Sequence, residues 1–111
     1  MTDVRFDPGL LRHRVAVERP VETPDGAGGA TIAWEPVATI WARLDPVRAS
    51  EKTIAAHLAA VATHKVTIRR REDVTGGMRI LFRGRRFRIL AVFDPDERGR
   101  YAVALTEEEN P

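Results

Sequence analysis

The chain has 111 residues, of which 43% are hydrophobic and 31% are charged. This length suits one domain, and the composition is that of a globular protein, which excludes a wholly disordered chain. The absence of cysteine excludes disulfide scaffolds, cysteine nucleophiles and thiolate metal sites. No apolar run approaches the roughly 20 residues that a membrane helix needs, so we expect no membrane association. Residues 1–8 lack an apolar signal core, so we expect a cytoplasmic protein without a secretory signal.

The net charge of +2 hides an uneven distribution of charged residues. Residues 65–100 hold 11 basic and 5 acidic side chains, whereas residues 1–64 hold 7 basic and 8 acidic ones. A dense basic stretch is typical of phosphate contact with nucleic acid. However, 16 of the 18 basic residues are arginine, a bias that a GC-rich coding sequence would itself produce. The stretch therefore suggests nucleic-acid binding, but it also fits the solvated outer face of a small barrel.

Alternation of apolar and polar residues predicts three short strands in the first half of the chain. They follow an extended arm at residues 1–9, and they cover residues 11–17, the residues around Ile32 and Trp34, and residues 37–44. Pro20 should end the first strand, and Pro36 should place an edge or a bulge after the second. The Gly- and Pro-rich residues 22–30 predict a turn or flexible loop, tightest at Asp25-Gly26.

A helix is predicted in the middle of the chain, after Asp45-Pro46 interrupts the strand pattern. Ser50 is suited to the N-cap position. Apolar residues then recur at helical spacing, at Ile54, Leu58 and Val61. We therefore expect one helix near residues 50–62, inside a loop inserted at 45–63.

The second half of the chain returns to strand-like alternation. Turns are expected at Gly76-Gly77, at Gly84 and at the polar residues 94–99, and a mobile tail at 107–111. The strands between these turns cover residues 64–71, 78–83, 87–91 and 101–105. Many short strands joined by Gly and Pro turns predict a mainly β fold. We expect a small β-barrel or sandwich of about 6–7 short strands, with one helix in a long inserted loop.

The side chains that could support catalysis or bind a metal do not form a recognisable pattern. The single serine, Ser50, lacks the sequence context of a nucleophile, and an N-cap explains it well. The three histidines, His13, His57 and His64, do not have the spacing of metal ligands. We therefore expect no catalytic residue, no metal and no cofactor, and hence no enzyme.

Interaction residues are easier to nominate. Trp41 lies on the less apolar side of its strand, which is typical of a protein interface or of a cap over an open barrel end. The basic strands at 65–71 and 79–88 could meet phosphate, or the acidic end of a neighbouring subunit. The interface candidates are Trp41, Arg69, Arg71, Arg86, Arg88, Glu107, Glu108 and Glu109.

Several short pieces follow one another in an order that covers residues 9–107. They are Leu11-Arg12-His13-Arg14-Val15, Asp25-Gly26 with Gly28-Gly29, Trp34 before the run 37–42, the run 63–69, Met78-Arg79-Ile80, and Phe87-Arg88-Ile89 before Asp94-Pro95. No single piece is diagnostic, but the ordered set closely resembles the head–tail joining family of long-tailed phages. These proteins are also called head-closure or stopper proteins, and they occur in prophages and gene transfer agents as well.

This resemblance implies a small β-barrel that assembles in the bacterial cytoplasm as a homo-oligomeric ring, a hexamer or a dodecamer. The ring would lie in the neck of a virion or phage-like particle. Portal and adaptor proteins would lie above it and a tail terminator or tail tube below it. Packaged double-stranded DNA would pass through its channel and be contacted without sequence specificity. The resemblance brings no catalytic residue and no cofactor.

The family's loop into the axial tunnel corresponds to residues 45–63 of this chain. Its first half carries Arg48 and Lys52, which are the candidate residues for contact with DNA in the tunnel. Residues 55–62 are alanine-rich and lack aromatic residues that some relatives have. Two alternatives stay open. The segment could pack as a lid over an open barrel end, and the whole chain could be a free-standing nucleic-acid-binding small β-barrel.

Overall fold

The computed structural model describes residues 11–47 and 61–109, which form six antiparallel strands in a closed barrel. The strands are β1 (His13–Pro24), β2 (Ala30–Pro46), β3 (His64–Arg69), β4 (Arg79–Phe82), β5 (Arg85–Phe93) and β6 (Tyr101–Glu109). Their order around the barrel is β1-β2-β3-β6-β5-β4. The expected mainly β fold is confirmed. The arm at 1–9 and most of the helix expected near 50–62 lie outside the described residues.

Two strands are longer than the sequence predicts. β1 does not end at Pro20 but continues to Pro24, and β2 is one strand where two were expected. The pairing of β1 with β2 shifts after Val17, because Val37 is an extra residue beside Pro36. The bulge expected at Pro36 is therefore present, and it interrupts the ladder without ending the strand.

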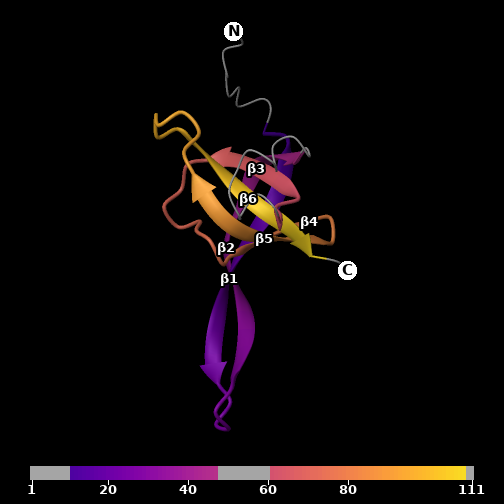
Figure 1. Ribbon diagram of the computed structural model, residues 1–111, viewed down its shortest axis with the longest axis vertical. Coiled ribbons are helices and arrows are strands. Elements are labelled where there is room, and N and C mark those ends of the chain that lie inside the picture. The colour runs from indigo at the N-terminus through magenta and orange to yellow at the C-terminus, as the bar shows by residue number, and fades with distance from the viewer. Residues whose placement is uncertain (1–10, 48–60, 110–111) are drawn as a thin grey trace.

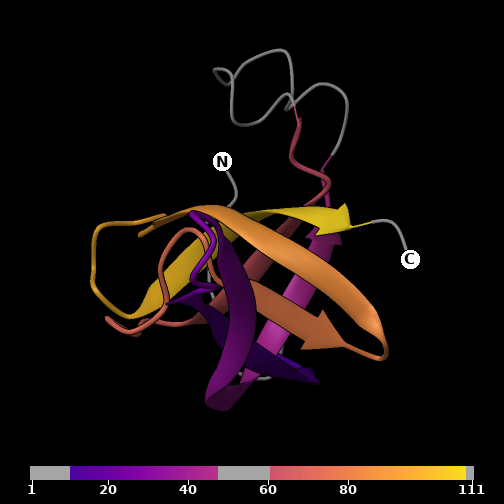
Figure 2. The ribbon, with the colours of Figure 1, turned by 90° about the horizontal axis from the view of Figure 1, so that it is seen from below.

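β1 and β2 project from the barrel as a two-stranded ribbon (Figure 1). β4 pairs with β1 only at residues 16–18, and β3 pairs with β2 only at residues 42–46. Beyond these positions, β1 and β2 pair only with each other. We call residues 19–35 the hairpin. A view along the hairpin shows the strands curving around one another to form the barrel (Figure 2).

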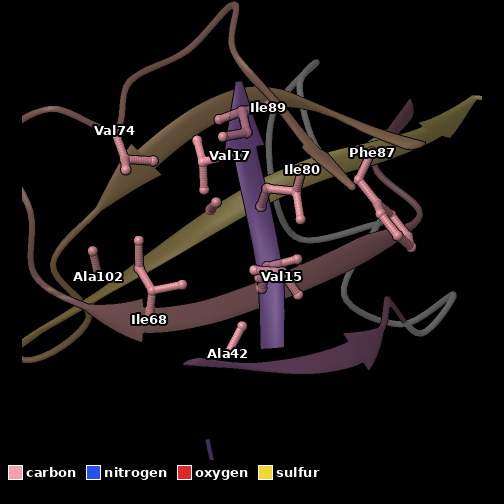
Figure 3. Packing of buried hydrophobic residues seen from close by; sticks show 11 residues of the cluster. Val15, Val17, Ala42, Ile68, Val74, Ile80, Phe87, Ile89 and Ala102 are labelled. Carbon is pink, nitrogen blue, oxygen red and sulfur yellow. The ribbon is translucent and has the colours of Figure 1, made fainter. Parts of the chain in front are cut away.

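The hydrophobic core fills the barrel (Figure 3). Alternate residues of each strand point inward, so Val15 and Val17 of β1 meet Ile80 of β4 and Phe87 of β5. All four of these side chains are at most 1% exposed. Val74, from the loop between β3 and β4, packs at the side of the cluster opposite Phe87.

The C-terminal strand β6 extends further than the sequence predicts. Residues 107–109 continue β6 and pair with β5, so a mobile tail that begins at 107 is wrong for these three residues. The pairing with the arginine-rich start of β5 keeps the three glutamates in the sheet. The expected turn at Gly84 is confirmed, because Arg83 and Gly84 have φ of 51° and 78° and join β4 to β5. Two consecutive positive φ values are the conformation of a tight hairpin turn.

Candidate interaction surfaces

The hairpin has two unlike faces, because directly opposite residues of two paired strands share one face. The first face carries Pro20, Glu22 and Pro24 of β1 opposite Trp34, Ile32 and Ala30 of β2. The second face carries Arg19, Val21 and Thr23 opposite Glu35, Ala33 and Thr31. Arg19 and Glu35 form an ion pair of 2.8 Å on the second face. The first face is mostly apolar, and its Ile32 side chain is 57% exposed.

The tip of the hairpin is held by the side chain of Asp25. Its Oδ1 atom accepts hydrogen bonds from the backbone N–H groups of Ala27, at 2.8 Å, and Gly29, at 3.1 Å. The Asp25 N–H donates to the carbonyl of Gly29 at 3.1 Å. Gly26 and Gly28 have φ of 79° and 85°, which a residue with a side chain rarely adopts. The turn expected at Asp25-Gly26 is confirmed, but it occupies only residues 25–29.

The base of the hairpin is tied to the barrel by Arg79 of β4. Its Nε atom donates to Glu18 Oε1 at 2.8 Å, and these two side chains are 17% and 19% exposed. This pair is more shielded from solvent than the pairs Arg19–Glu35, Arg43–Asp45 and Arg88–Glu107. The Arg79 guanidinium also lies over the ring of Trp34, 4.1 Å from its centroid. One side chain of the barrel therefore holds both strands of the hairpin where they leave it.

Trp41 is on the surface, as an interface residue must be. It is 51% exposed, and the guanidinium of Arg14 on β1 lies 5.3 Å from its ring centroid. Trp41 is directly opposite Arg14, on the outer side of the barrel. Its exposure fits the interface interpretation and not the interpretation that Trp41 caps an open end of the barrel.

One end of the barrel is closed by Phe87 and three polar side chains. The ring of His64 packs edge-on against Phe87 at 5.1 Å, and the Arg85 guanidinium lies 4.9 Å from the Phe87 centroid. Arg85 donates to both carboxylate oxygens of Glu108, at 2.8 and 3.0 Å. These hydrogen bonds lower the pKa of Glu108. Burial lowers the pKa of His64, against the opposite effect of Glu108.

The acidic end of the chain pairs with its own barrel. Arg88 meets Glu107 at 2.7 Å, and Arg86 meets Glu109 at 3.8 Å, both across the ladder of β5 and β6. With Arg85 and Glu108, they form three ion pairs within one chain. Neighbouring strands of the same subunit therefore supply opposite charges to all three glutamates, and their contact with the arginines of a neighbouring subunit stays a prediction.

The other pair of candidate arginines, Arg69 and Arg71, lies away from Arg86 and Arg88. Arg69 pairs with Tyr101 at the start of β6, whereas Arg86 pairs with Glu109 at its end, so the two basic pairs are at opposite ends of the barrel. Arg71 makes two hydrogen bonds of 2.9 Å to Asp73, which raise the pKa of Arg71 and lower that of Asp73. Within the described part of the chain, Arg69, Arg70 and Arg98 have no acidic side chain within 4.0 Å.

Arg48 and Lys52 lie outside the described residues, but both ends of their segment are placed. The N–H of Val47 donates to the carbonyl of Thr63 at 2.9 Å, and the N–H of Thr63 donates to Thr106 at 2.8 Å. The Thr63 hydroxyl also accepts from the N–H of Glu108 at 2.7 Å. The chain thus leaves and re-enters the barrel at one point, next to the end of β6.

The hairpin is the feature that sequence reasoning missed. The sequence pattern predicts a loop and a short strand there, because Pro20 is expected to end the first strand and residues 22–30 are rich in Gly and Pro. The spacing of four residues between Pro20 and Pro24 is compatible with an edge strand. Both prolines then face the outer edge, and the hydrogen bonds to the partner strand stay intact. The described residues contain no group of three or more His, Asp or Glu side chains that could hold a metal ion. Nor do they include a helix that is long and apolar enough to cross a membrane.

Comparisons with known proteins agree with this geometry. A family model described as phage head completion protein matches residues 6–109. The solution structure of protein SF1141 from Shigella flexneri 2a is similar with a TM-score of 0.76 and 27% identity, over 93% of this chain and 96% of that one. A chain from the virion of a native gene transfer agent particle is similar with a TM-score of 0.67 and 26% identity, over 88% of this chain and 94% of that one.

A search of curated proteins gives no match. The family match covers nearly the whole chain, and the two structures match over nearly the whole of both chains. The chain therefore belongs to the phage head completion protein family, and its role is structural, in the head–tail region of a phage or phage-like particle.

Proposed function

We propose that this chain forms a ring in the neck of a phage or phage-like particle, where it closes the head and joins it to the tail. The observation that carries this proposal is the similarity to a chain of a gene transfer agent virion, which covers 88% of this chain and 94% of that one. The ring is a hexamer or a dodecamer, assembled in the bacterial cytoplasm. Portal or adaptor proteins lie above it, and a tail terminator or tail tube lies below it.

A closed ring needs two different surfaces on each subunit, one meeting the next copy and one meeting the previous copy. The barrel offers surfaces of different chemistry on different strands. The outer side of β1 and β2 carries Trp41 and Arg14, whereas β5 and β6 carry the ion pairs of Arg86 and Arg88. This asymmetry supports head-to-tail contacts between neighbouring subunits.

The proposed role in retaining DNA rests on residues 48–62. The residues on either side of this segment are fixed beside β6, because the N–H of Val47 donates to the carbonyl of Thr63 and the N–H of Thr63 donates to the carbonyl of Thr106. Connections of this length are longer than a barrel needs to join two strands, and such long connections are usually functional. In a ring, every subunit places Arg48 and Lys52 at the same radius. The summed field then attracts duplex phosphate strongly, although each contact is weak.

Charge reversal tests this role. We expect particles that carry Arg48→Glu with Lys52→Glu to assemble and then to lose packaged DNA. The matched control is Arg69→Glu with Arg98→Glu, which makes the same charge change at arginines without an acidic neighbour among the described residues. Full DNA content in the Arg48/Lys52 particles contradicts the retention role. Electron microscopy of particles with the labelled chain tests the neck position directly.

A free-standing nucleic-acid-binding barrel is the second candidate. Arg69, Arg70 and Arg98 favour it, since their charges are not neutralised by acidic side chains of the described residues. Such a protein binds duplex DNA as an isolated chain, with an affinity that falls steeply with salt. A ring component binds DNA poorly as a monomer. Salt-dependent binding of the purified chain, together with its absence from particles, would favour the second candidate.

A further inference from the structure

We propose that the outer edge of β2 in the hairpin accepts an extended, basic segment of another particle protein as an added strand. The inference rests on the proposed structural role, because the partner belongs to the same particle. The surface comprises Ala30, Ile32 and Trp34 with the neighbouring Glu22. It is separate from the ion pairs of β5 and β6.

The pattern of backbone hydrogen bonds identifies which N–H groups of the hairpin point outward. The N–H of Asp25 donates to the carbonyl of Gly29, so this pair is hydrogen-bonded across the hairpin. Hydrogen-bonded and non-hydrogen-bonded pairs alternate along an antiparallel ladder. The pairs of Ala30, Ile32 and Trp34 with β1 are therefore non-hydrogen-bonded, and the N–H groups of these three residues point away from β1.

The two edges of the hairpin differ in their capacity to receive a strand. On β1 the outward positions are Pro20, Glu22 and Pro24, and the two prolines have no N–H to donate. On β2 the outward positions keep all three donors, and β3 pairs with β2 only from Ala42 onward. Prolines at an edge block pairing with further strands. The β1 edge is thus protected, whereas the β2 edge is open.

The side chains beside the open edge favour an apolar strand. Ile32 is 57% exposed, and the hairpin face that it shares with Trp34 and the two prolines has one charged residue, Glu22. Strand addition takes its affinity from backbone hydrogen bonds and its specificity from side chains on alternate positions. The partner segment therefore carries apolar side chains at alternate positions and lacks proline.

Charge disfavours the hairpin of a second copy as the partner. The hairpin holds three acidic residues, Glu22, Asp25 and Glu35, and one basic residue, Arg19. Arg19 is paired with Glu35 on the opposite face, so the hairpin of a second copy has no cation available for Glu22. A basic segment supplies that cation, and the hairpins of two copies repel one another. The proline-blocked β1 edge also prevents hairpins from adding to one another in a continuous series.

Ile32→Pro and Ile32→Val form a matched pair of variants. Proline removes the outward N–H and leaves the bonds to β1, whereas valine has a similar size and keeps the N–H. In cells that assemble particles, we expect Ile32→Pro to lower incorporation of the chain at least about tenfold and Ile32→Val to change it less than about twofold. Equal incorporation of the two variants overturns the inference. Hydrogen exchange of Val21 and Thr23 confirms that the hairpin is intact in both.

Glu22 provides an independent test. We expect Glu22→Lys to lower incorporation more than Glu22→Gln, and the difference to shrink as salt rises. A photo-reactive benzophenone residue at Ala30 in assembled particles then identifies the partner. A cross-linked peptide from another particle protein, rich in lysine or arginine, supports the inference. A peptide from a second copy of this chain, or no cross-link, overturns it.

Failure of this inference differs from failure of the proposed function. If the wild-type chain enters particles and Ile32→Pro enters equally well, only the strand addition is wrong. If the wild-type chain does not enter particles at all, the structural role is wrong, and the inference falls with it.

Discussion

β1 and β2 pass through two environments, the barrel and the hairpin, and the same strands behave differently in each. In the barrel, Val15 and Val17 are at most 1% exposed, and neighbouring strands pair with both edges over part of their length. In the hairpin, Ile32 is 57% exposed and each strand has one partner. The pairing of β1 with β2 is common to both regions. The difference shows that burial stabilises the barrel, whereas the hairpin is held by contacts at its own tip and base.

An isolated two-stranded hairpin is at most marginally stable in water. Here the tip is fixed by Asp25, and the base by Arg79 between Glu18 and Trp34. A structure that needs such supports and does not contribute to the core is expected to serve an interaction. Each of the following predictions tests the contrast between the barrel and the hairpin.

The largest expected effect comes from the core. Phe87→Ala should lower the free energy of unfolding by about 3–5 kcal/mol, because a fully buried aromatic side chain leaves a cavity. Ile32→Ala in the hairpin should change it by less than about 0.5 kcal/mol, because the side chain is exposed. Urea denaturation measures both values. Equal losses would contradict the division of stability between the two regions.

The junction should give an intermediate effect. Arg79→Ala removes a shielded ion pair and the contact with Trp34, so we expect a loss of about 1–2 kcal/mol in the free energy of unfolding. Hydrogen exchange of Val21 and Thr23 should accelerate more than that of the barrel strands. The matched control is Arg19→Ala, which breaks an exposed pair and should cost less than about 0.5 kcal/mol. Uniform acceleration across the barrel would show that Arg79 does not act locally.

The end of the barrel near His64 should give a pH-dependent effect. Burial lowers the pKa of His64, while Glu108 opposes this and Arg85 adds to it. A base with a lowered pKa binds fewer protons when folded, so stability is complete above about pH 6.5 and declines as the pH falls through the folded pKa. We expect the thermal midpoint of the wild type to fall between about pH 7.5 and 5.5, and His64→Gln to reduce this fall. An unchanged slope in the variant would refute the assignment to His64.

The smallest effect is expected at the surface pairs of β5 and β6. Replacing Glu107, Glu108 and Glu109 with glutamine should lower the free energy of unfolding by less than about 1 kcal/mol per pair, and less in high salt. Because these pairs lie within one chain, assembly onto particles should be unchanged even at low salt. Loss of assembly at low salt would instead support the hypothesis that these glutamates pair with arginines of a neighbouring subunit.

The pattern of the sequence alone determined the fold class. Alternation located the inward residues of β1, β3, β4 and the first half of β5, including Val15, Ile80 and Phe87, because a side-chain period of two leaves one face for the core. In β6 it pointed to the face of Tyr101 and Val103, whereas Ala102 and Ala104 face the core. It also located the turns at Asp25-Gly26 and Gly84, where positive φ values favour glycine. The ordered resemblance gave the family, which the match over residues 6–109 confirms.

Tertiary structure alone decided the extent of the hairpin and the partners of the charges. Pro20 is compatible with a strand only because its N atom faces an edge that β4 does not cover, and no local pattern shows where that cover ends. The sequence leaves Glu107, Glu108 and Glu109 without an assigned partner in their own chain, because it does not show which strands adjoin. The fold places β6 beside β5, and the register of that pairing brings each glutamate to an arginine of the same chain.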